Sequence, residues 1–220
     1  MNIQAHLDAA GVACTDAQAE QLAAYAADVL RLNDKLNLIA RTDVQHVVER
    51  HIVHCATLAR TPFPTGAQVV DWGTGGGFPL VPLAILRPEA VYTGVDAVEK
   101  KVLAVRAMAR NLGLKNLTTW HGRAEQFAAP RSHSVSRATA PLEMLWKWHL
   151  GDPPAESMVG DDANAWPAGL ICLKGGDLSD EIEALTSRFP EVQVNVGPVG
   201  LSDPYFADKH IVTVTPGRST

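Results

Sequence analysis

Apolar residues recur at helical spacing in the first part of the chain and predict two helices. The first begins after Thr15, which can cap it, and Gln18 completes a capping box. Its apolar face consists of Leu22, Tyr25, Val29, Leu32 and Leu36. A second helix is expected over 44–58, before a Pro-containing break at 61–64. The apolar side of that second helix would carry Val47, Val48, Ile52, Cys55 and Leu58.

After residue 66 the pattern changes to short apolar runs that alternate with helical segments. This alternation is typical of a parallel sheet covered by helices on both faces. Strands are expected at 69–72, 92–95, 117–120, 135–136 and 170–173, with helices at 81–86, 98–112, 142–150 and 180–189. The last two strands, at 192–196 and 211–214, have no long helix between them, which favours an antiparallel ending.

Together these elements predict an α/β fold with a mostly parallel, seven-stranded sheet. Residues 1–65 would form an N-terminal helical extension that packs on a core of residues 66–220. The segment 152–167 is rich in Pro, Asp and Ala and has no period, so it is expected to be an exposed loop.

The composition is that of an ordinary globular protein, with 46% hydrophobic and 20% charged residues. No apolar run is long enough for a membrane helix, and no leader peptide is recognisable. Three cysteines at wide spacing fit neither a disulfide framework nor a thiolate metal site, which favours a reducing cytoplasm. The net charge is −5, but residues 100–147 hold nine basic and two acidic side chains. Any nucleic-acid contact would therefore use one local face; the alternative is a solvated helix surface.

The most informative motif is the run Val-Val-Asp-Trp-Gly-Thr-Gly-Gly-Gly-Phe-Pro at 69–79. A buried strand there runs into glycines, which let a ligand approach the backbone, and then into a helix whose N-terminus would offer free N–H groups. The pattern indicates a nucleotide-like ligand. The dinucleotide fingerprint G-x-G-x-x-G fails in both registers, because Phe78 or Leu80 stands where a small third residue is needed. The sequence also lacks the NTPase pattern G-x-x-x-x-G-K-[ST].

Two acidic residues narrow the choice of ligand. Asp71 ends the first strand and Asp96 ends the second, and between them lies the turn that contains Gly73 and Gly75. A carboxylate at Asp96 is placed to accept hydrogen bonds from both hydroxyls of a ribose, and Asp71 would orient the loop or meet a cationic amino-acid end. This combination favours S-adenosylmethionine, which has a ribose and a sulfonium but no phosphate. Taken singly, a glycine turn is often structural, and an Asp at a strand end is often a helix cap.

Several of these runs resemble the bacterial ribosomal RNA small subunit methyltransferase G family, also called glucose-inhibited division protein B. The resemblance extends from Leu32 to Val214 and is most specific in the glycine turn with its Phe-Pro tail and in Ser-Arg-Ala at 136–138. It also includes Asn-Asp-Lys-Leu-Asn-Leu at 33–38, Arg-His-Ile at 50–52, Lys-Lys at 100–101, Gly-Arg-Ala-Glu at 122–125, Leu-Lys-Gly at 173–175 and Lys-His-Ile-Val at 209–212. The resemblance implies a Rossmann-like class I methyltransferase fold and methyl transfer from S-adenosylmethionine to N7 of a guanine in small-subunit (16S) ribosomal RNA.

Carried over by position, the resemblance implies cofactor contacts at five residues. These are Gly73, Phe78, Ala124, Glu125 and Arg137. The contacts at Asp96, Asp71 and Gly75 are expected from the chemistry of the glycine turn itself.

The chain also departs from the family pattern. Trp72 replaces a smaller aliphatic residue, Lys209 stands where Arg is usual, and the 152–167 segment looks like an insertion. Ser132 and His133 replace an Asp followed by an apolar residue, and His133 and Ser134 are unusual in a buried strand.

Guanine N7 has a lone pair and no proton, so displacement at the sulfonium methyl needs no general base. The enzyme would act by alignment and by exclusion of water. Arg137, Arg123 and Lys174, with Lys209, are the candidates for contacts to guanine O6 or to RNA phosphates. The alternative for each is a surface cation or a salt bridge.

No metal site is expected, because His51 and His54 have no third ligand at a suitable spacing. His51 is expected to pack against the cofactor-binding core or the RNA, and Phe78 is the one aromatic residue expected at the site. The expected partner is small-subunit ribosomal RNA or the ribosomal subunit, and the protein is expected to be a cytoplasmic monomer. Two other functions remain open: a methyltransferase for a small molecule or protein, and an S-adenosylmethionine-binding module without catalysis.

Overall fold

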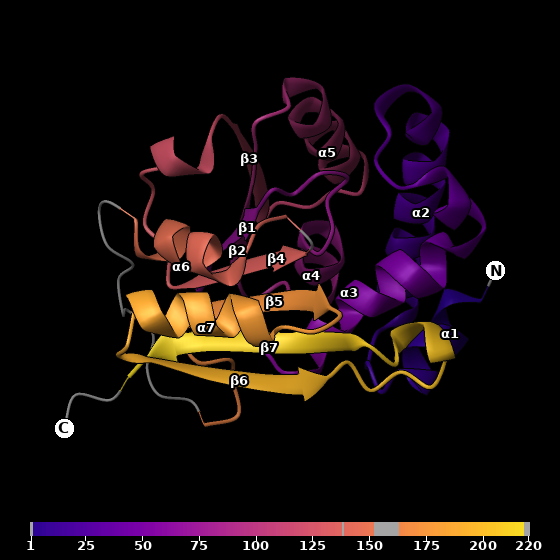
Figure 1. Ribbon diagram of the computed structural model, residues 1–220. Coiled ribbons are helices and arrows are strands. Elements are labelled where there is room, and N and C mark those ends of the chain that lie inside the picture. Colours follow the sequence, from indigo (N-terminus) through magenta and orange to yellow (C-terminus); the bar gives the residue numbers. More distant parts are fainter. Residues whose placement is uncertain (1, 138, 152–162, 218–220) are drawn as a thin grey trace.

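The computed structural model describes residues 2–137, 139–151 and 163–217, which form one seven-stranded sheet with helices on both faces (Figure 1). The strands are β1 (Gln68–Trp72), β2 (Val91–Asp96), β3 (Leu117–His121), β4 (His133–Arg137), β5 (Gly169–Gly175), β6 (Val192–Pro198) and β7 (Lys209–Pro216). Their order is β3-β2-β1-β4-β5-β7-β6. The first five strands are parallel, whereas β7 runs antiparallel to both β5 and β6. The predicted α/β sheet with an antiparallel ending is confirmed.

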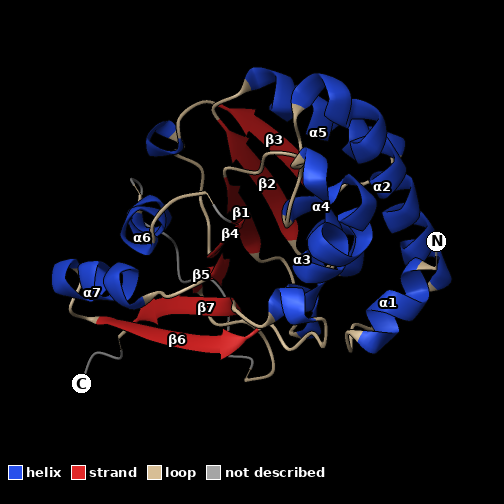
Figure 2. Ribbon diagram, turned by 45° about the vertical axis from the view of Figure 1, so that its right-hand side comes forward, coloured by secondary structure: helices blue, strands red, loops and turns tan. Residues whose placement is uncertain are grey.

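Successive residues of a strand point to opposite faces, so each strand serves two apolar cores. Val69 of β1 belongs to one core and its neighbour Val70 to the other. The helices that flank the sheet are α4 (Leu80–Leu86), α5 (Glu99–Asn111), α6 (Leu142–Leu150) and α7 (Ser179–Arg188). Figure 2 shows α4 and α5 on one side of the sheet and α6 and α7 on the other. Because both faces are covered, β1 and β5 are buried and apolar over most of their length.

The N-terminal extension packs beside α4 and α5 (Figure 2). Its first two helices are α1 (Ile3–Ala9) and α2 (Asp16–Leu36). The predicted capping box is present: the Gln18 N–H donates to Thr15 Oγ1 at 3.3 Å, and the Thr15 N–H donates to Gln18 Oε1 at 2.9 Å. A single apolar cluster joins this extension to the sheet.

The second predicted helix is a series of short helical turns of three types. They are η1 (Arg41–His46), η2 (Val47–Val53), α3 (His54–Ala56) and η3 (Thr57–Arg60). The predicted segment 44–58 is helical throughout, but it is not a regular α-helix, because η1 and η3 are 3-10 helices and η2 is a π-helix. The five residues assigned to its apolar side are nevertheless buried. Hydrophobic spacing therefore located the buried side but not the helical type.

Strand β4 is longer than the predicted 135–136 and is mostly polar. His133, Ser134 and Ser136 are all 0% exposed, and each has a hydrogen-bond partner. His133 Nε2 lies 3.1 Å from the Trp166 carbonyl, Ser134 Oγ lies 2.9 Å from His149 Nδ1, and the Ser136 hydroxyl donates to the Trp72 carbonyl at 2.9 Å. A buried polar group costs little when it is hydrogen-bonded, so the strand tolerates these residues.

Part of the predicted 152–167 loop, residues 152–162, lies outside the described residues, as does Ala138 of the Ser-Arg-Ala run. Of the described loop residues, 163, 164 and 167 are exposed, whereas Trp166 is half-buried and anchored. The Trp166 N–H donates to the Pro62 carbonyl at 2.8 Å, and its indole N–H donates to the Leu58 carbonyl at 2.9 Å. Within the described parts of the chain, every helix is too short or too polar to cross a membrane.

Candidate active site

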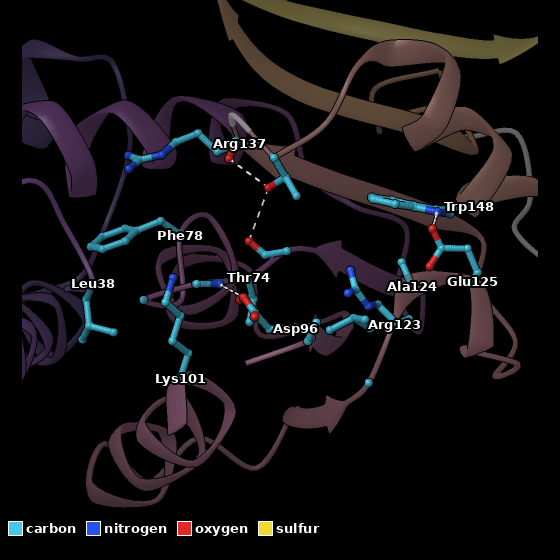
Figure 3. A pocket seen from close by; sticks show the side chains of 17 residues that line it. Leu38, Thr74, Phe78, Asp96, Lys101, Arg123, Ala124, Glu125, Arg137 and Trp148 are labelled. Carbon is cyan, nitrogen blue, oxygen red and sulfur yellow. Dashed lines mark hydrogen bonds between the residues drawn. The ribbon is translucent and has the colours of Figure 1, made fainter. Parts of the chain in front are cut away.

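A cavity of about 520 Å³ opens at the carboxyl ends of β1 and β2, beside β4 (Figure 3). The strand order reverses between β1 and β4, and ligands of open α/β sheets bind at such switch points. Seven of the eight predicted cofactor contacts line the cavity, namely Gly73, Gly75, Phe78, Asp96, Ala124, Glu125 and Arg137.

The glycine turn adopts a backbone that other residues would strain. Gly73 has φ +70°, and a Cβ atom there would lie 2.1 Å from the Thr139 side chain. Gly75 has φ +57°. Both positions need glycine for the conformation, and Gly73 also needs it for the close approach to Thr139. At these two positions the turn therefore presents backbone, not side chains, to a ligand.

Asp96 ends β2, and its carboxylate accepts two backbone hydrogen bonds. Oδ2 accepts from the Gly75 N–H at 2.9 Å, and Oδ1 accepts from the Val98 N–H at 2.8 Å. Asp96 thus ties the glycine turn to the start of α5. A carboxylate offers about four acceptor positions, so each oxygen retains one for a further donor. One residue can both shape the loop and accept hydrogen bonds from a bound sugar.

Asp71 lies beneath the glycine turn and does not line the cavity. It is 0% exposed, and neither carboxylate oxygen has a hydrogen bond of normal geometry among the described residues. Burial raises the pKa of Asp71 to about 7, and the nearby Thr74 hydroxyl and Leu80 N–H limit the rise. Of the two roles expected for Asp71, this position favours orientation of the loop over contact with a ligand.

The N-terminus of α4 is closed to ligands, contrary to the expectation that it offers free N–H groups. Every residue of α4 is buried, and neither Pro79 nor Pro82 in its first turn has an N–H. The Leu80 N–H lies beside Asp71. A phosphate would therefore find few donors at this helix end.

Arg137 and Phe78 form the wall of the cavity nearest the N-terminal extension (Figure 3). The guanidinium carbon of Arg137 lies 5.1 Å from the centroid of the Phe78 ring. Its Nη2 atom lies 2.6 Å from His51 Nδ1, so the head group is turned toward the extension. Arg137 is therefore suited to shaping this wall of the cavity and to giving it a positive charge.

Glu125 and Trp148 form the opposite side of the cavity (Figure 3). The Trp148 indole N–H donates to Glu125 Oε1 at 3.0 Å. Arg123 is exposed and also lines the cavity, whereas Ala124 presents only a small side chain there. This side therefore combines an aromatic face, a carboxylate and an exposed cationic side chain.

Lys174 does not line the cavity. Its ammonium donates to Glu181 Oε2 at 2.6 Å and to the Ala140 carbonyl at 2.7 Å. The same Glu181 oxygen accepts from the Leu142 N–H at the start of α6, at 2.9 Å. Lys174 thus links β5 to α6 and α7. For this lysine the structure shows the salt bridge that the sequence left open as the alternative to an RNA contact. Lys209 is also outside the lining and pairs with Asp208 at 2.8 Å.

Sequence reasoning missed several residues that the fold brings to the cavity. Leu38, Lys101, Thr139 and Trp148 line it but were not assigned to the site. Leu38 and Lys101 lie in runs that resemble the family, so position alone could have suggested them. Thr139 and Trp148 offer no such local signal, because their contacts join segments distant in sequence.

The sequence of this chain is similar to the sequences of known proteins. A family model described as rRNA small subunit methyltransferase G matches residues 18–159. A Salinibacter ruber protein named ribosomal RNA small subunit methyltransferase G is 46% identical over 205 residues, which cover 91% of this chain and 94% of that protein. A Bacteroides fragilis protein with the same name is 38% identical over 202 residues, with 91% and 94% coverage.

Solved structures with low sequence identity share the fold. The YcgJ protein from Bacillus subtilis has a TM-score of 0.55 at 13% identity and covers 77% of this chain and 100% of its own. An rRNA methylase from Streptococcus thermophilus has a TM-score of 0.51 at 14% identity, with 74% and 94% coverage. The fold is the Rossmann-like fold of class I methyltransferases. With the glycine turn and Asp96 at the expected strand ends, and with relatives matched over nearly its whole length, the chain belongs to the ribosomal RNA small subunit methyltransferase G family.

Proposed function

We propose that this protein transfers the methyl group of S-adenosylmethionine to N7 of a guanine in small-subunit (16S) ribosomal RNA. The observation that carries the proposal is the cavity at the switch point of the sheet, which Gly73, Gly75, Phe78 and Asp96 line together. The names of relatives at 46% and 38% identity support the RNA as substrate. The protein would act in the cytoplasm, on free RNA or on the ribosomal subunit.

The residues of the cavity fit S-adenosylmethionine better than a phosphorylated nucleotide. The closed N-terminus of α4 removes the usual phosphate site. Asp96 keeps acceptor positions for the ribose hydroxyls, and Glu125 adds a second carboxylate suited to a cationic ligand. The glycine positions of the turn leave room for close approach to the backbone. These residues would hold the cofactor.

When bound, S-adenosylmethionine supplies an electrophilic methyl group. Guanine N7 carries no proton, so no side chain has to act as a base during the transfer. The chain contributes by holding the two reactants in line and by excluding water. Phe78, which is 4% exposed, and Leu38 give the cavity apolar walls for that purpose.

Exposed cations near the cavity would hold RNA phosphates. Arg123 is the best candidate, because it is exposed, lines the cavity and forms no ion pair with any of the described residues. Arg137 is bonded to the N-terminal extension and is better suited to positioning. Arg131, one of the nine basic residues at 100–147, is only 1% exposed and donates to the His149 carbonyl, so it adds nothing to the RNA-facing charge.

Methyl-labelled S-adenosylmethionine tests the proposal. The protein is incubated with it and, in separate reactions, with small ribosomal subunits, naked 16S ribosomal RNA and a metabolite extract. We expect label in RNA, and cleavage at one guanine after borohydride and aniline treatment, which marks N7-methylguanine. If the label is found only in metabolites or in protein, the substrate is one of these and not RNA. Cofactor binding without transfer in every reaction would indicate a binding module.

A further inference from the structure

His51 lies in the π-helix η2 of the N-terminal extension, yet it contacts the wall of the cofactor cavity. It is 5% exposed. Its Nδ1 atom lies 2.6 Å from Arg137 Nη2, and its Nε2 atom lies 3.3 Å from Asp43 Oδ2. The imidazole therefore bridges a carboxylate of the extension to a guanidinium at the end of β4.

The partners of His51 determine its tautomer. A guanidinium has donors only, so the Nδ1 atom that faces Arg137 carries a lone pair. The proton is then on Nε2, which donates to Asp43. Burial, together with the Arg137 charge, lowers the pKa of His51 to about 4, although Asp43 opposes the change. His51 is therefore a neutral acceptor for Arg137 at neutral pH.

Asp43 is itself held in place behind the imidazole. Its Oδ1 atom accepts from Arg50 Nη1 at 3.0 Å, and the Arg50 guanidinium lies 4.2 Å from the centroid of the Tyr205 ring. Because both oxygens of Asp43 are engaged, the carboxylate is fixed in orientation and can in turn fix the imidazole.

On the side that faces the cavity, His51 and Arg137 both contact the ring of Phe78. The centroids of the His51 and Phe78 rings are 5.3 Å apart, and Arg137 lies over Phe78 at 5.1 Å. Arg137 also donates to the Arg50 carbonyl at 3.4 Å. Without the Nδ1 acceptor, the strongest of these directional contacts on Arg137 is lost, and the head group can rotate on its flexible stem.

We propose that His51 is a positioning residue that holds Arg137 and Phe78 in the orientation that forms the S-adenosylmethionine pocket. This inference rests on the proposed function, because the pocket is assigned to that cofactor there. It also gives the N-terminal extension a direct role in cofactor binding, through the hydrogen-bonded side chains of Asp43, His51 and Arg137.

The test compares variants that keep or remove the Nδ1 acceptor. His51→Asn places an amide oxygen near the Nδ1 position, whereas His51→Phe keeps a ring against Phe78 but accepts no hydrogen bond. A charged hydrogen bond contributes about 1.5–3 kcal/mol, so we expect His51→Phe to weaken S-adenosylmethionine binding by roughly 10- to 100-fold in calorimetry. His51→Asn should recover most of that loss. Equal affinities for the wild type and His51→Phe would overturn the proposal.

His54→Phe is the matched control. His54 is 6% exposed, three residues further along the same segment, and contacts the Phe206 ring at 5.3 Å without a hydrogen bond to Arg137. The His54→Phe variant should lower stability about as much as His51→Phe does but leave cofactor affinity unchanged. If both variants lose affinity equally, His51 acts through stability alone and the proposal is wrong.

A readout independent of the cofactor is the ¹⁵N imidazole spectrum of the full chain, with His51 assigned by difference against His51→Asn. We expect a protonated Nε2 and an unprotonated Nδ1 at pH 7. The reverse tautomer would overturn the proposal even if the protein methylates RNA. Conversely, a wild type that binds no S-adenosylmethionine would refute the proposed function while leaving this hydrogen-bond geometry intact.

Discussion

The Tyr25 hydroxyl donates a hydrogen bond to the Gly76 carbonyl at 2.8 Å and thereby joins helix α2 to the glycine turn. Tyr25 is 0% exposed, and its ring centroid lies 5.2 Å from that of Phe78. Burial raises the pKa of Tyr25 well above its usual value, so the hydroxyl stays a donor. The extension thus supports the glycine turn from beneath, in addition to the contacts of His51.

Tyr25→Phe should weaken both folding and cofactor binding. The substitution leaves the Gly76 carbonyl without its donor, which costs about 1–2 kcal/mol of stability. Tyr92→Phe is the matched control, because the buried Tyr92 hydroxyl donates to the Arg87 carbonyl at 3.0 Å, away from the cavity. We expect similar losses in urea denaturation, with a several-fold loss of S-adenosylmethionine affinity only in Tyr25→Phe. Equal affinities in calorimetry would show that the loop does not depend on Tyr25.

Asp96→Ala should reduce S-adenosylmethionine affinity more than any comparable change at the surface. It removes the acceptor of the Gly75 and Val98 N–H groups and the proposed ribose contact. Loss of charged hydrogen bonds predicts about 1.5–3 kcal/mol, measured by calorimetry. Glu99→Ala, at an exposed position outside the cavity lining, serves as the control. Unchanged affinity in Asp96→Ala would remove the ribose assignment.

Lys174→Met should lower stability without lowering cofactor affinity. The Lys174 side chain is 8% exposed and its ammonium pairs with Glu181, so its removal leaves a carboxylate with only the Leu142 N–H as a partner among the described residues. We expect a loss of about 1–3 kcal/mol in the free energy of unfolding. Methyl transfer per folded molecule should stay close to that of the wild type. A selective loss of transfer, with unchanged stability, would restore Lys174 as an RNA contact.

Stability should fall as the pH falls from 6.5 toward 5. Burial lowers the pKa of His51 to about 4 and the pKa values of His54 and His149 to about 3. The unfolded chain, with histidine pKa values near 6.5, then binds more protons, and each histidine lowers stability by up to about 1.4 kcal/mol per pH unit.

Asp71 contributes with the opposite sign over the same range. Its pKa is about 7 when folded against 3.8 as the ordinary value, so the folded state keeps a proton that the unfolded state releases. Three histidines outweigh one carboxyl, and the net loss between pH 6.5 and pH 5 is about 3 kcal/mol. Urea titrations at the two pH values measure it. His54→Phe should remove about one histidine's share, and a flat profile in the wild type would contradict the assignment of neutral buried histidines.

Local patterns were sufficient to predict much of the site. The strand that ends at Trp72, the glycine turn and Asp96 at the end of β2 are each encoded by short runs of residues. Parallel strands bring their carboxyl ends to one edge of the sheet, so these runs predict a shared cavity from the sequence alone. The capping box of α2 was predictable for the same reason, because Thr15 and Gln18 contact each other within one helical turn.

Contacts between distant segments were not predictable in this way. The sequence could not indicate that Lys174 would pair with Glu181, because a cation at the end of a strand can bind an RNA phosphate or a carboxylate equally well. It likewise could not show that Asp71 would lie under the turn, or that Arg131 would be buried. These outcomes depend on which helices cover each face of the sheet.

The amino-acid order alone determined the α/β fold and the position of the glycine turn, and it predicted the class of ligand that we propose, because hydrophobic period, glycine and strand-end carboxylates act over a few residues. Only the tertiary structure decided that the N-terminal extension forms a wall of the pocket. Tyr25 reaches Gly76, and His51 reaches Arg137, across separations of 51 and 86 residues. Such hydrogen bonds exist only after packing has brought the segments together, since no local pattern specifies the distance between them.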